Sequence, residues 1–332
     1  MPLKYPNKRK RNGYWKIYDR ARIKDFRKVW EFAKQIVEEQ GTPYKKKDNR
    51  GRKPNLTYVE NAAICIILVC FDLSLRDTEG EIPLLTNRAL DHSNIDRWFE
   101  KLDDDYVYEA VRKLGTKMES MFNDGCYIAD STEYTTTRYY ELIDGGKRAI
   151  ELLTLKMHIL ICYIASIGLL VVRNCFASHG DAHDSPIFRN YLLEDVDLQS
   201  GRMIHADCAY FAIENIRKCK QLGLKPNFVP KENIEHSLTL KIAIKEYDNK
   251  ARKKNRGLIE GFFGGTTTET DNKIRFVKDR CRKTYLALVA LKHQIRTYFR
   301  ALEIKALRFL YYFATTPIKN LSDISQRSLK CL

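Results

Sequence analysis

Residues 126–132 read Cys-Tyr-Ile-Ala-Asp-Ser-Thr and place one acid, Asp130, at the end of a short apolar run. Residues 203–207 read Met-Ile-His-Ala-Asp and end in a second acid, Asp207. Short apolar runs with polar boundaries are typical of buried strands. Because side chains at strand ends can converge on one rim of a sheet, the two stretches predict strands that bring Asp130 and Asp207 close together.

A third acid, Glu260, lies in the stretch Arg-Gly-Leu-Ile-Glu-Gly-Phe-Phe at residues 256–263, which we expect to be helical. Ile259, Phe262 and Phe263 would anchor the inward face of this helix and let Glu260 reach the rim. Carboxylate oxygens suit divalent metals, and a metal pair about 4 Å apart cleaves and joins phosphodiesters. Each acid also has an ordinary alternative role, which is to cap a turn, to cap the next helix or to lie on the surface.

The predicted elements after residue 123 follow the order β-β-β-α-β-α-β-α. The fold class that this order predicts is α/β: a ribonuclease H-like core, with a mixed five-stranded sheet flanked by helices, which follows an N-terminal helical domain. The expected strands cover residues 126–132, 153–163, 168–176, 201–207 and 225–230, and the expected helices cover residues 184–194, 209–222, 234–262 and 280–314.

Basic residues gather at the N-terminal end. The chain has 332 residues with 58 Lys/Arg and 42 Asp/Glu, a net charge of +16. Residues 1–54 hold 18 Lys/Arg and 6 Asp/Glu, so this segment alone has a net charge of +12. Such a balance favours polyanionic partners, nucleic acid first. The segment predicts a basic arm, either solvated or bound to phosphates, and a helix at residues 25–40.

The next segment reads as helical, with capping residues at Thr57 or Asn55, at Ser74 and at Ser93. Its helix, turn and short capped helix resemble a helix-turn-helix, and an ordinary helical hairpin is the alternative. Two basic side chains of this region, Arg88 and Arg97, are expected DNA contacts. The expected domains are residues 1–54 (basic arm and helix), 55–122 (helical DNA-binding domain), 123–302 (catalytic core) and 303–332 (C-terminal helix and tail).

The nine cysteines form no C-x-x-C pair, and most lie inside apolar runs. This pattern predicts buried, reduced thiols rather than a disulfide framework or a zinc site. The polar, basic start of the chain argues against a secretory signal. The apolar run at residues 62–71 is too short to cross a bilayer, and the run at 159–172 reads better as two strands joined by a tight turn. We therefore expect a cytoplasmic, nucleoid-associated protein with no membrane partner.

Four segments are similar to motifs of one known family. They are Asp-Ser-Thr at 130–132, Ser-His-Gly-Asp-Ala-His-Asp-Ser-Pro at 178–186, Ala-Asp-Cys-Ala-Tyr at 206–210 and Arg-Gly-Leu-Ile-Glu-Gly-Phe-Phe-Gly at 256–264. Through these motifs the chain resembles DDE transposases of insertion sequences, the insertion-sequence four/five type. The similarity spans roughly residues 123–300, with a looser match over residues 74–102.

The resemblance implies that Asp130, Asp207 and Glu260 form a catalytic, metal-binding triad that holds two Mg²⁺ or Mn²⁺ ions. It also implies a DNA contact for Arg256, one helical turn before Glu260, where a guanidinium can meet a phosphate bidentately. A helix salt bridge between Arg256 and Glu260 is the alternative.

Two positions depart from the family's pattern. Lys253 stands where the family usually has Tyr, and Thr267 stands where it has Lys. Lys273 and Arg275, further along the chain, could supply the missing cation. The expected DNA contacts of the core are therefore Arg256, Lys253, Lys273 and Arg275.

Three histidines, His179, His183 and His205, lie near the predicted site. Histidine is not the preferred ligand of Mg²⁺, so structural or hydrogen-bonding roles are favoured. Another acid of this region, Asp184, is expected to cap the helix that begins near Pro186.

The resulting hypothesis is a DNA transposase that binds insertion-sequence ends, cleaves them and joins their 3′-hydroxyl ends to target DNA by two-metal phosphoryl transfer. Its partners would be double-stranded DNA, as terminal inverted repeats and as target. A second copy of the chain is also expected, because two element ends must be brought together. The alternatives are a transposase-derived DNA-binding protein without catalysis and a ribonuclease H-like nuclease without strand transfer.

Overall fold

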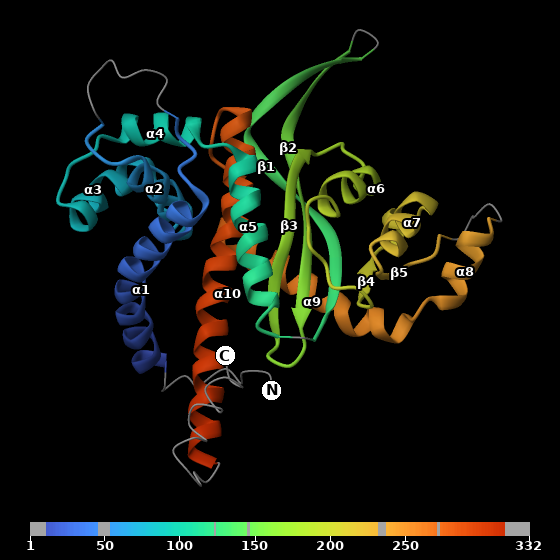
Figure 1. The fold of residues 1–332 in the computed structure, drawn as a ribbon. Coiled ribbons are helices and arrows are strands. Elements are labelled where there is room, and N and C mark those ends of the chain that lie inside the picture. Colours follow the sequence, from blue (N-terminus) through green and yellow to red (C-terminus); the bar gives the residue numbers. More distant parts are fainter. Residues whose placement is uncertain are drawn as a thin grey trace. The chain divides into compact units, whose positions relative to one another are not determined.

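The computed structural model describes residues 11–45, 54–122, 124–144, 147–231, 237–270 and 273–315. These residues form a mixed α/β structure with a six-stranded sheet flanked by helices (Figure 1). The chain divides into two compact units, each discontinuous in sequence. Unit 1 comprises Met1–Ala110, Tyr134–Leu155 and Thr267–Lys292, and unit 2 comprises Val111–Glu133, Lys156–Thr266 and His293–Leu332. This division does not follow the domain boundaries expected after residues 54, 122 and 302, which stay a prediction.

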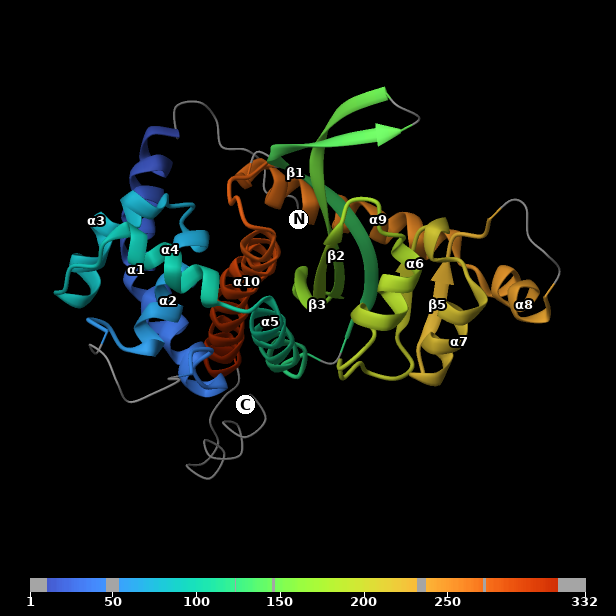
Figure 2. The same cartoon turned by 90° about the horizontal axis from the view of Figure 1, so that it is seen from above.

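The sheet has the strand order β3-β2-β1-β4-β5, with β6 paired separately to β1. The pairs β1–β4, β4–β5 and β1–β6 run parallel. Strands β2 and β3 are neighbours joined by a tight turn at residues 165–168, so they run in opposite directions. The turn predicted between these two strands is thus confirmed. Figures 1 and 2 show β1 and β2 as a long, curved pair. The strands are β1 (Cys126–Asp144), β2 (Lys147–Ile164), β3 (Leu169–His179), β4 (Met203–Ala206), β5 (Lys225–Phe228) and β6 (Lys273–Ile274).

All five predicted strands are present, and β6 is an addition. Strand β1 begins after Gly125, whose φ of +134° suits glycine and where a Cβ would lie 2.2 Å from the carbonyl oxygen of Tyr163. Tyr127, Ile128 and Ala129 are then at most 3% exposed. A strand buried in this continuous way is covered on both faces, which holds the residues that follow it in a fixed place.

The helices of unit 1 begin at side-chain caps. Thr57 and Ser74 each accept a hydrogen bond from the backbone N–H three residues on, and Glu60 and Asp77 each accept one from the N–H of the capping residue. Both starts are thus complete capping boxes, which confirms the predicted cap at Ser74 and selects Thr57 over the alternative Asn55. The helices are α1 (Arg11–Gln40), α2 (Tyr58–Cys70), α3 (Leu75–Thr86) and α4 (His92–Lys101).

The start of α4 differs from the prediction. Asp91, not Ser93, is the capping residue, because the Asp91 carboxylate accepts a hydrogen bond from the Ser93 N–H at 2.8 Å. Helix α2 is buried from Asn61 to Cys70 and contacts α1, α3 and α4. Helices α3 and α4 also contact each other, while their role in DNA binding stays a prediction. The first ten residues of the predicted basic arm lie outside the described residues.

Helices of unit 2 pack closely against β3. A Cβ on Gly115 of α5 would lie 2.4 Å from the carbonyl oxygen of Val172, so glycine permits this approach. The Gln294 side chain of α10 donates to the same carbonyl at 2.6 Å and accepts from the Val172 N–H at 2.8 Å. Helices α7 and α8 contact β5. The remaining helices are α5 (Asp104–Glu119), α6 (Asp184–Ile187), α7 (Ile213–Gln221), α8 (Leu238–Glu246), α9 (Asn249–Thr270) and α10 (Asp279–Thr315).

Three predicted helices differ in extent from the prediction, and one of them, predicted at 209–222, begins later, as α7 (Ile213–Gln221). The helix predicted at residues 184–194 is the single turn α6, followed by the wider helical turn Phe188–Leu192. The helix predicted at 234–262 is divided into α8 and α9, because the Asn227 side chain accepts from the Asp248 N–H and donates to the Asp248 carbonyl. Residues 232–236 lie outside the described residues.

The described helices include none with the length and apolar character needed to cross a membrane. Six of the eight described cysteines are buried, which confirms the predicted burial for most of them. The two others are Cys126, which is half-buried, and Cys208, which is exposed.

A buried charge cluster supports the strands of unit 2. Glu119, at the end of α5, forms an ion pair with Arg173 Nε at 2.7 Å and accepts hydrogen bonds from Arg202 at 2.6 Å and from the Tyr127 hydroxyl at 2.5 Å. Glu119 and Arg173 are at most 2% exposed, and Arg202 is 9% exposed. Because Tyr127 lies in β1 and Arg202 directly precedes β4, the cluster links the beginnings of these two strands.

Candidate active site

The parallel pairing of β1 and β4 sets two predicted acids side by side. Ile128 pairs with His205, an offset of 77 residues. The same offset separates Asp130 from Asp207, so the two acids stand at one level of neighbouring strands. Such strands lie about 4.8 Å apart, and residues at one level point to the same face of the sheet. The structure therefore brings Asp130 and Asp207 together.

Both acids line a cavity of about 120 Å³ in unit 2. Glu260 lines it from α9, together with Arg256 and Arg252, which are placed at successive turns of the same helix. One cavity thus gathers the three predicted acids and two arginines. Arg252 was not predicted, although its i, i+4 spacing from Arg256 is a signal that could have found it.

Each strand acid also has a local hydrogen bond. Asp207 caps the helical turn Cys208–Tyr210 by accepting from the Ala209 N–H at 2.9 Å. Asp130 accepts from the Ser131 N–H at 2.8 Å. Within the described residues each acid makes only this one hydrogen bond, so its second oxygen stays available to the cavity. Asp130 and Asp207 therefore make local hydrogen bonds to the backbone and also line the same cavity.

Glu260 is paired with an arginine. Its carboxylate accepts from Arg256 Nε at 2.7 Å, and both side chains are about 60% exposed (61% for Arg256 and 60% for Glu260). This is the helix salt bridge that the sequence left open as an alternative. Ion pairs at exposed positions contribute only about 0.2–1 kcal/mol, so a cation or a phosphate that competes for either partner can separate them.

A buried histidine holds α9 against β4. His205 Nδ1 lies 3.0 Å from the Asn227 side-chain amide, and Nε2 lies 3.1 Å from the amide of Asn255, the residue before Arg256. The three side chains are at most 8% exposed. Burial lowers the pKa of His205 to about 4, against a smaller opposing effect of Asp248, so the ring is neutral near pH 7. His205 therefore fixes the start of the helical face that carries Arg256.

Crowding of carboxylates affects Asp130. The pKa of Asp130 is raised to about 6, mainly by burial and to a smaller extent by the carboxylates of Asp207 and Asp184, while the Ser131 N–H and Arg256 act against the increase. Like charges in a partly buried place disfavour ionisation. A cation bound between Asp130 and Asp207 would relieve this effect, so the electrostatics of the cavity suit a positive ligand.

Asp184 is a fourth acid of the site, which the sequence assigned to a helix cap. Its carboxylate accepts a hydrogen bond from Ser131 Oγ at 2.8 Å, and it lies 3.0 Å from Lys156 Nζ and 3.2 Å from His158 Nδ1. Burial acts to raise the pKa of Asp184, but the hydrogen bonds from these partners hold it at about 2. The capping prediction is wrong, because the residue at the cap position is His183 and Asp184 faces the strands.

Tyr210 lies among the acids. It is fully buried, and its pKa is raised well above the ordinary value by burial and then by the carboxylates of Asp184, Asp130 and Asp207. The hydroxyl therefore keeps its proton. Tyr210 therefore adds no negative charge near the three carboxylates, and it does not line the cavity itself.

The donor set of the cavity fits a hard divalent cation. Asp130, Asp207 and Glu260 offer carboxylate oxygens, which are the ligands that Mg²⁺ prefers and that suit Mn²⁺. His205 offers no free nitrogen, since side-chain amides lie at hydrogen-bonding distance from both ring positions. His179 and His183 are exposed and do not line the cavity. The acids, rather than the histidines, are the ligands that this cavity could supply.

Another acidic group lies in unit 1. Among the described residues, only Glu79, Asp91 and His92 bring three ligand atoms within 4.8 Å of one another. Glu79 accepts from the backbone N–H of His92 at 3.1 Å and lies 2.8 Å from its ring Nδ1, and Asp91 caps α4. Capping of a helix explains this group, of which Asp91 is exposed and the two other residues are half-buried. In the described conformation, in which Glu260 is paired with Arg256, the carboxylate oxygens of Asp130, Asp207 and Glu260 do not all lie within 4.8 Å of one another.

The other predicted DNA contacts are dispersed. Lys253 is exposed on α9 but does not line the cavity. Lys273 and Arg275 belong to unit 1, where they line a different cavity. Arg88 is exposed and donates to a backbone carbonyl at 2.7 Å, and Arg97 is exposed on α4. Of the predicted basic residues, Arg256 alone lines the cavity with the three acids.

In metal-free protein, Asp130→Asn is expected to raise stability above about pH 6. The pKa of this carboxyl is about 6 in the folded chain, against an ordinary value of 3.8. Ionisation is therefore harder in the folded chain than in the unfolded chain, so the wild type loses stability as the pH rises from 3.8 through 6. The amide cannot ionise, so the variant should gain on the order of 2–3 kcal/mol relative to wild type at neutral pH. Urea unfolding in EDTA across this pH range measures the difference, and parallel profiles for the two proteins would contradict it.

No protein-family model matches this chain, and no curated protein is similar enough to it to count as a relative.

Proposed function

We propose that this chain is a DNA transposase with a ribonuclease H-like core, which cleaves the ends of an insertion sequence and joins their 3′-hydroxyls to target DNA. One observation carries the proposal: Asp130 and Asp207 stand at one level of parallel strands, and Glu260 lines the same cavity from a helix. The strand order β3-β2-β1-β4-β5 is consistent with that fold. The basic balance of the chain supports a nucleic-acid substrate.

The acidic and the basic residues of the cavity would have different roles. Asp130, Asp207 and Glu260 would hold the divalent metals, Mg²⁺ or Mn²⁺. When bound, such metals activate the attacking oxygen and stabilise the leaving oxygen of a phosphodiester. The carboxylates themselves are not nucleophiles. Arg252 and Arg256 present guanidinium groups that can hold phosphate oxygens in a bidentate way.

The exchange of partners at Glu260 links these roles. In the described conformation Arg256 and Glu260 neutralise each other. If Glu260 turns into the cavity beside Asp130 and Asp207, Arg256 loses its partner and becomes available to DNA. The same helical turn would thus prepare the acid for its metal and the arginine for its phosphate.

Strand cleavage and joining test the proposed function. A linear DNA that carries the sequence flanking the coding region is mixed with the protein and a target plasmid, with Mg²⁺, with Mn²⁺ or with EDTA. We expect joined products with either metal and none with EDTA. Cleavage without joining would indicate a nuclease, and DNA binding without cleavage would indicate a non-catalytic relative of transposases. Either result would contradict the proposal.

Arg256→Ala is expected to weaken DNA binding with little effect on folding. Loss of one phosphate contact should reduce the slope of log affinity against log salt by about 1. Loss of an exposed ion pair should change stability by no more than about 1 kcal/mol. Fluorescence anisotropy at several salt concentrations measures the slope. Lys245→Ala, an exposed cation on α8 outside the cavity, is the control, and an unchanged slope in Arg256→Ala would remove Arg256 from the DNA interface.

A further inference from the structure

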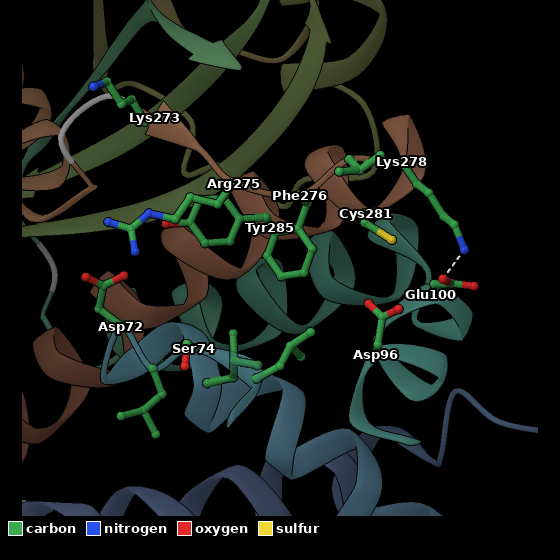
Figure 3. A pocket seen from close by; sticks show the side chains of 14 residues that line it. Asp72, Ser74, Asp96, Glu100, Lys273, Arg275, Phe276, Lys278, Cys281 and Tyr285 are labelled. Carbon is green, nitrogen blue, oxygen red and sulfur yellow. Dashed lines mark hydrogen bonds and ion pairs between the residues drawn. The ribbon is translucent and has the colours of Figure 1, made fainter. Parts of the chain in front are cut away.

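Unit 1 contains a larger cavity, of about 360 Å³, that the proposed chemistry does not use (Figure 3). It is enclosed by the turn between α2 and α3, by α4, by residues 273–278 and by the start of α10, all within unit 1. Its volume falls within the range of about 300–1,000 Å³ that is typical of small-ligand sites. The cavity can therefore accept a ring system with its substituents.

The interior of this cavity is apolar and aromatic. Phe276 is half-buried and lies 5.6 Å from the ring of Tyr285, which is 8% exposed. The Phe276 ring is held in place by stacking on Phe99 of α4, with centroids 4.3 Å apart and planes at 11°. Leu73 is half-buried and Val277 is 50% exposed, and both add apolar surface. A flat ligand would meet a surface that is already formed.

Charges of opposite sign come from opposite walls of the cavity. Lys273 and Arg275 are exposed on the extended segment, and they make no ion pair within the part of the chain that the structure describes. Asp72 and Asp96 come from the helical side (Figure 3). The third cation, Lys278, is already ion-paired. Two cations without partners beside an apolar surface favour a ligand that combines an anion with a flat apolar group.

We propose that this cavity binds one unpaired nucleotide of DNA. Lys273 and Arg275 hold the phosphate through charge-assisted hydrogen bonds. The base lies against Phe276 and Val277, since any base can stack on an aromatic side chain. The Asp96 carboxylate accepts a hydrogen bond from an amino group of the base, as acidic side chains do from cytosine.

A nucleotide matches this cavity better than the alternatives of similar size. In a duplex the faces of a base are covered by its neighbours and its edge by its partner, so a paired base cannot enter. An ordinary peptide side chain offers a flat ring or an anion but not both. The site shares no residue with the carboxylate cavity and requires no metal. It rests on the proposed function only in taking DNA as the polymer.

Binding of an unpaired base in EDTA tests the proposal. Anisotropy gives the affinity of the full chain for a duplex with one unpaired 2-aminopurine and for a fully paired duplex. We expect wild type to bind the first about tenfold more tightly and to shield its base from quenching by acrylamide. Arg275→Ala should lose this preference. Arg280→Ala should keep it, because Arg280 is an exposed arginine that lies outside the cavity and is paired with Asp103.

Asp96→Ala adds a test of base recognition. Without the carboxylate, a preference of the wild type for unpaired cytosine over unpaired thymine should disappear, while thermal melting confirms that the variant is folded. Equal affinity of wild type for paired and unpaired duplexes would overturn the proposal, as would a preference that survives in Arg275→Ala. If the preference is present but no strand joining occurs with metal, the transposase assignment fails and the nucleotide site stands.

Discussion

Asp207→Asn is expected to abolish Mg²⁺-dependent cleavage and joining, with a loss well above about a hundredfold. The amide keeps an oxygen that can accept from the Ala209 N–H, so the cap and the fold should survive. The negative charge beside Asp130 is lost, and with it the ability to share a divalent metal. Partners that only orient a metal ligand contribute about 10- to 100-fold, and the ligand itself should contribute more.

Single-turnover cleavage of labelled end DNA measures this effect. The matched control is Asp181→Asn, because Asp181 is exposed in the turn after β3 and does not line the cavity. Normal melting of Asp207→Asn together with lost cleavage would support the assigned role. Cleavage at a rate close to that of wild type would remove Asp207 from the active site.

Glu119→Ala should destabilise the chain by about 3–5 kcal/mol, the largest stability effect that we expect. The substitution leaves Arg173 and Arg202 buried without their carboxylate. It also removes the acceptor of the Tyr127 hydroxyl, which lies in β1. Since breaking a buried ion pair leaves an uncompensated charge, the loss should exceed that of any exposed pair.

Urea unfolding of the full chain measures the change, with Glu194→Ala as the control. Glu194 is 54% exposed in its side chain and pairs with Lys218 at 3.0 Å. Loss of that exposed pair should cost no more than about 1 kcal/mol. If Glu119→Ala costs as little as the control, the buried cluster does not stabilise unit 2.

Local patterns were sufficient for the main strands and for several helix starts. The apolar run before Asp130 predicts β1 because a strand covered on both faces has no room for polar residues. Thr57 and Ser74 predict helix starts because capping depends on residues only three positions apart. The position of Asp207 after an apolar run predicts a strand end. Asp130 and Asp207 stand at one level because they are separated by the same number of residues as the paired Ile128 and His205.

Distant contacts were beyond the reach of such patterns. Asp184 faces Lys156 and His158 of β2, and no local signal in the sequence joins these positions. Strand β6 has two residues, too few for a period to appear. The i, i+4 spacing of Arg256 and Glu260 permits either a salt bridge between them or a phosphate contact by Arg256, and only the structure shows that the salt bridge is present.

The discontinuity of unit 1 has a consequence for synthesis of the chain. Its N-terminal helices contact Phe276 and Thr284 through Phe99 and the Leu102 carbonyl. These partners leave the ribosome only after two of the three segments of unit 2, Val111–Glu133 and Lys156–Thr266, have been translated. Until then, the N-terminal helices of unit 1 have an apolar surface that is exposed to solvent. A fragment that ends at residue 122 would keep this surface exposed and would be prone to aggregation.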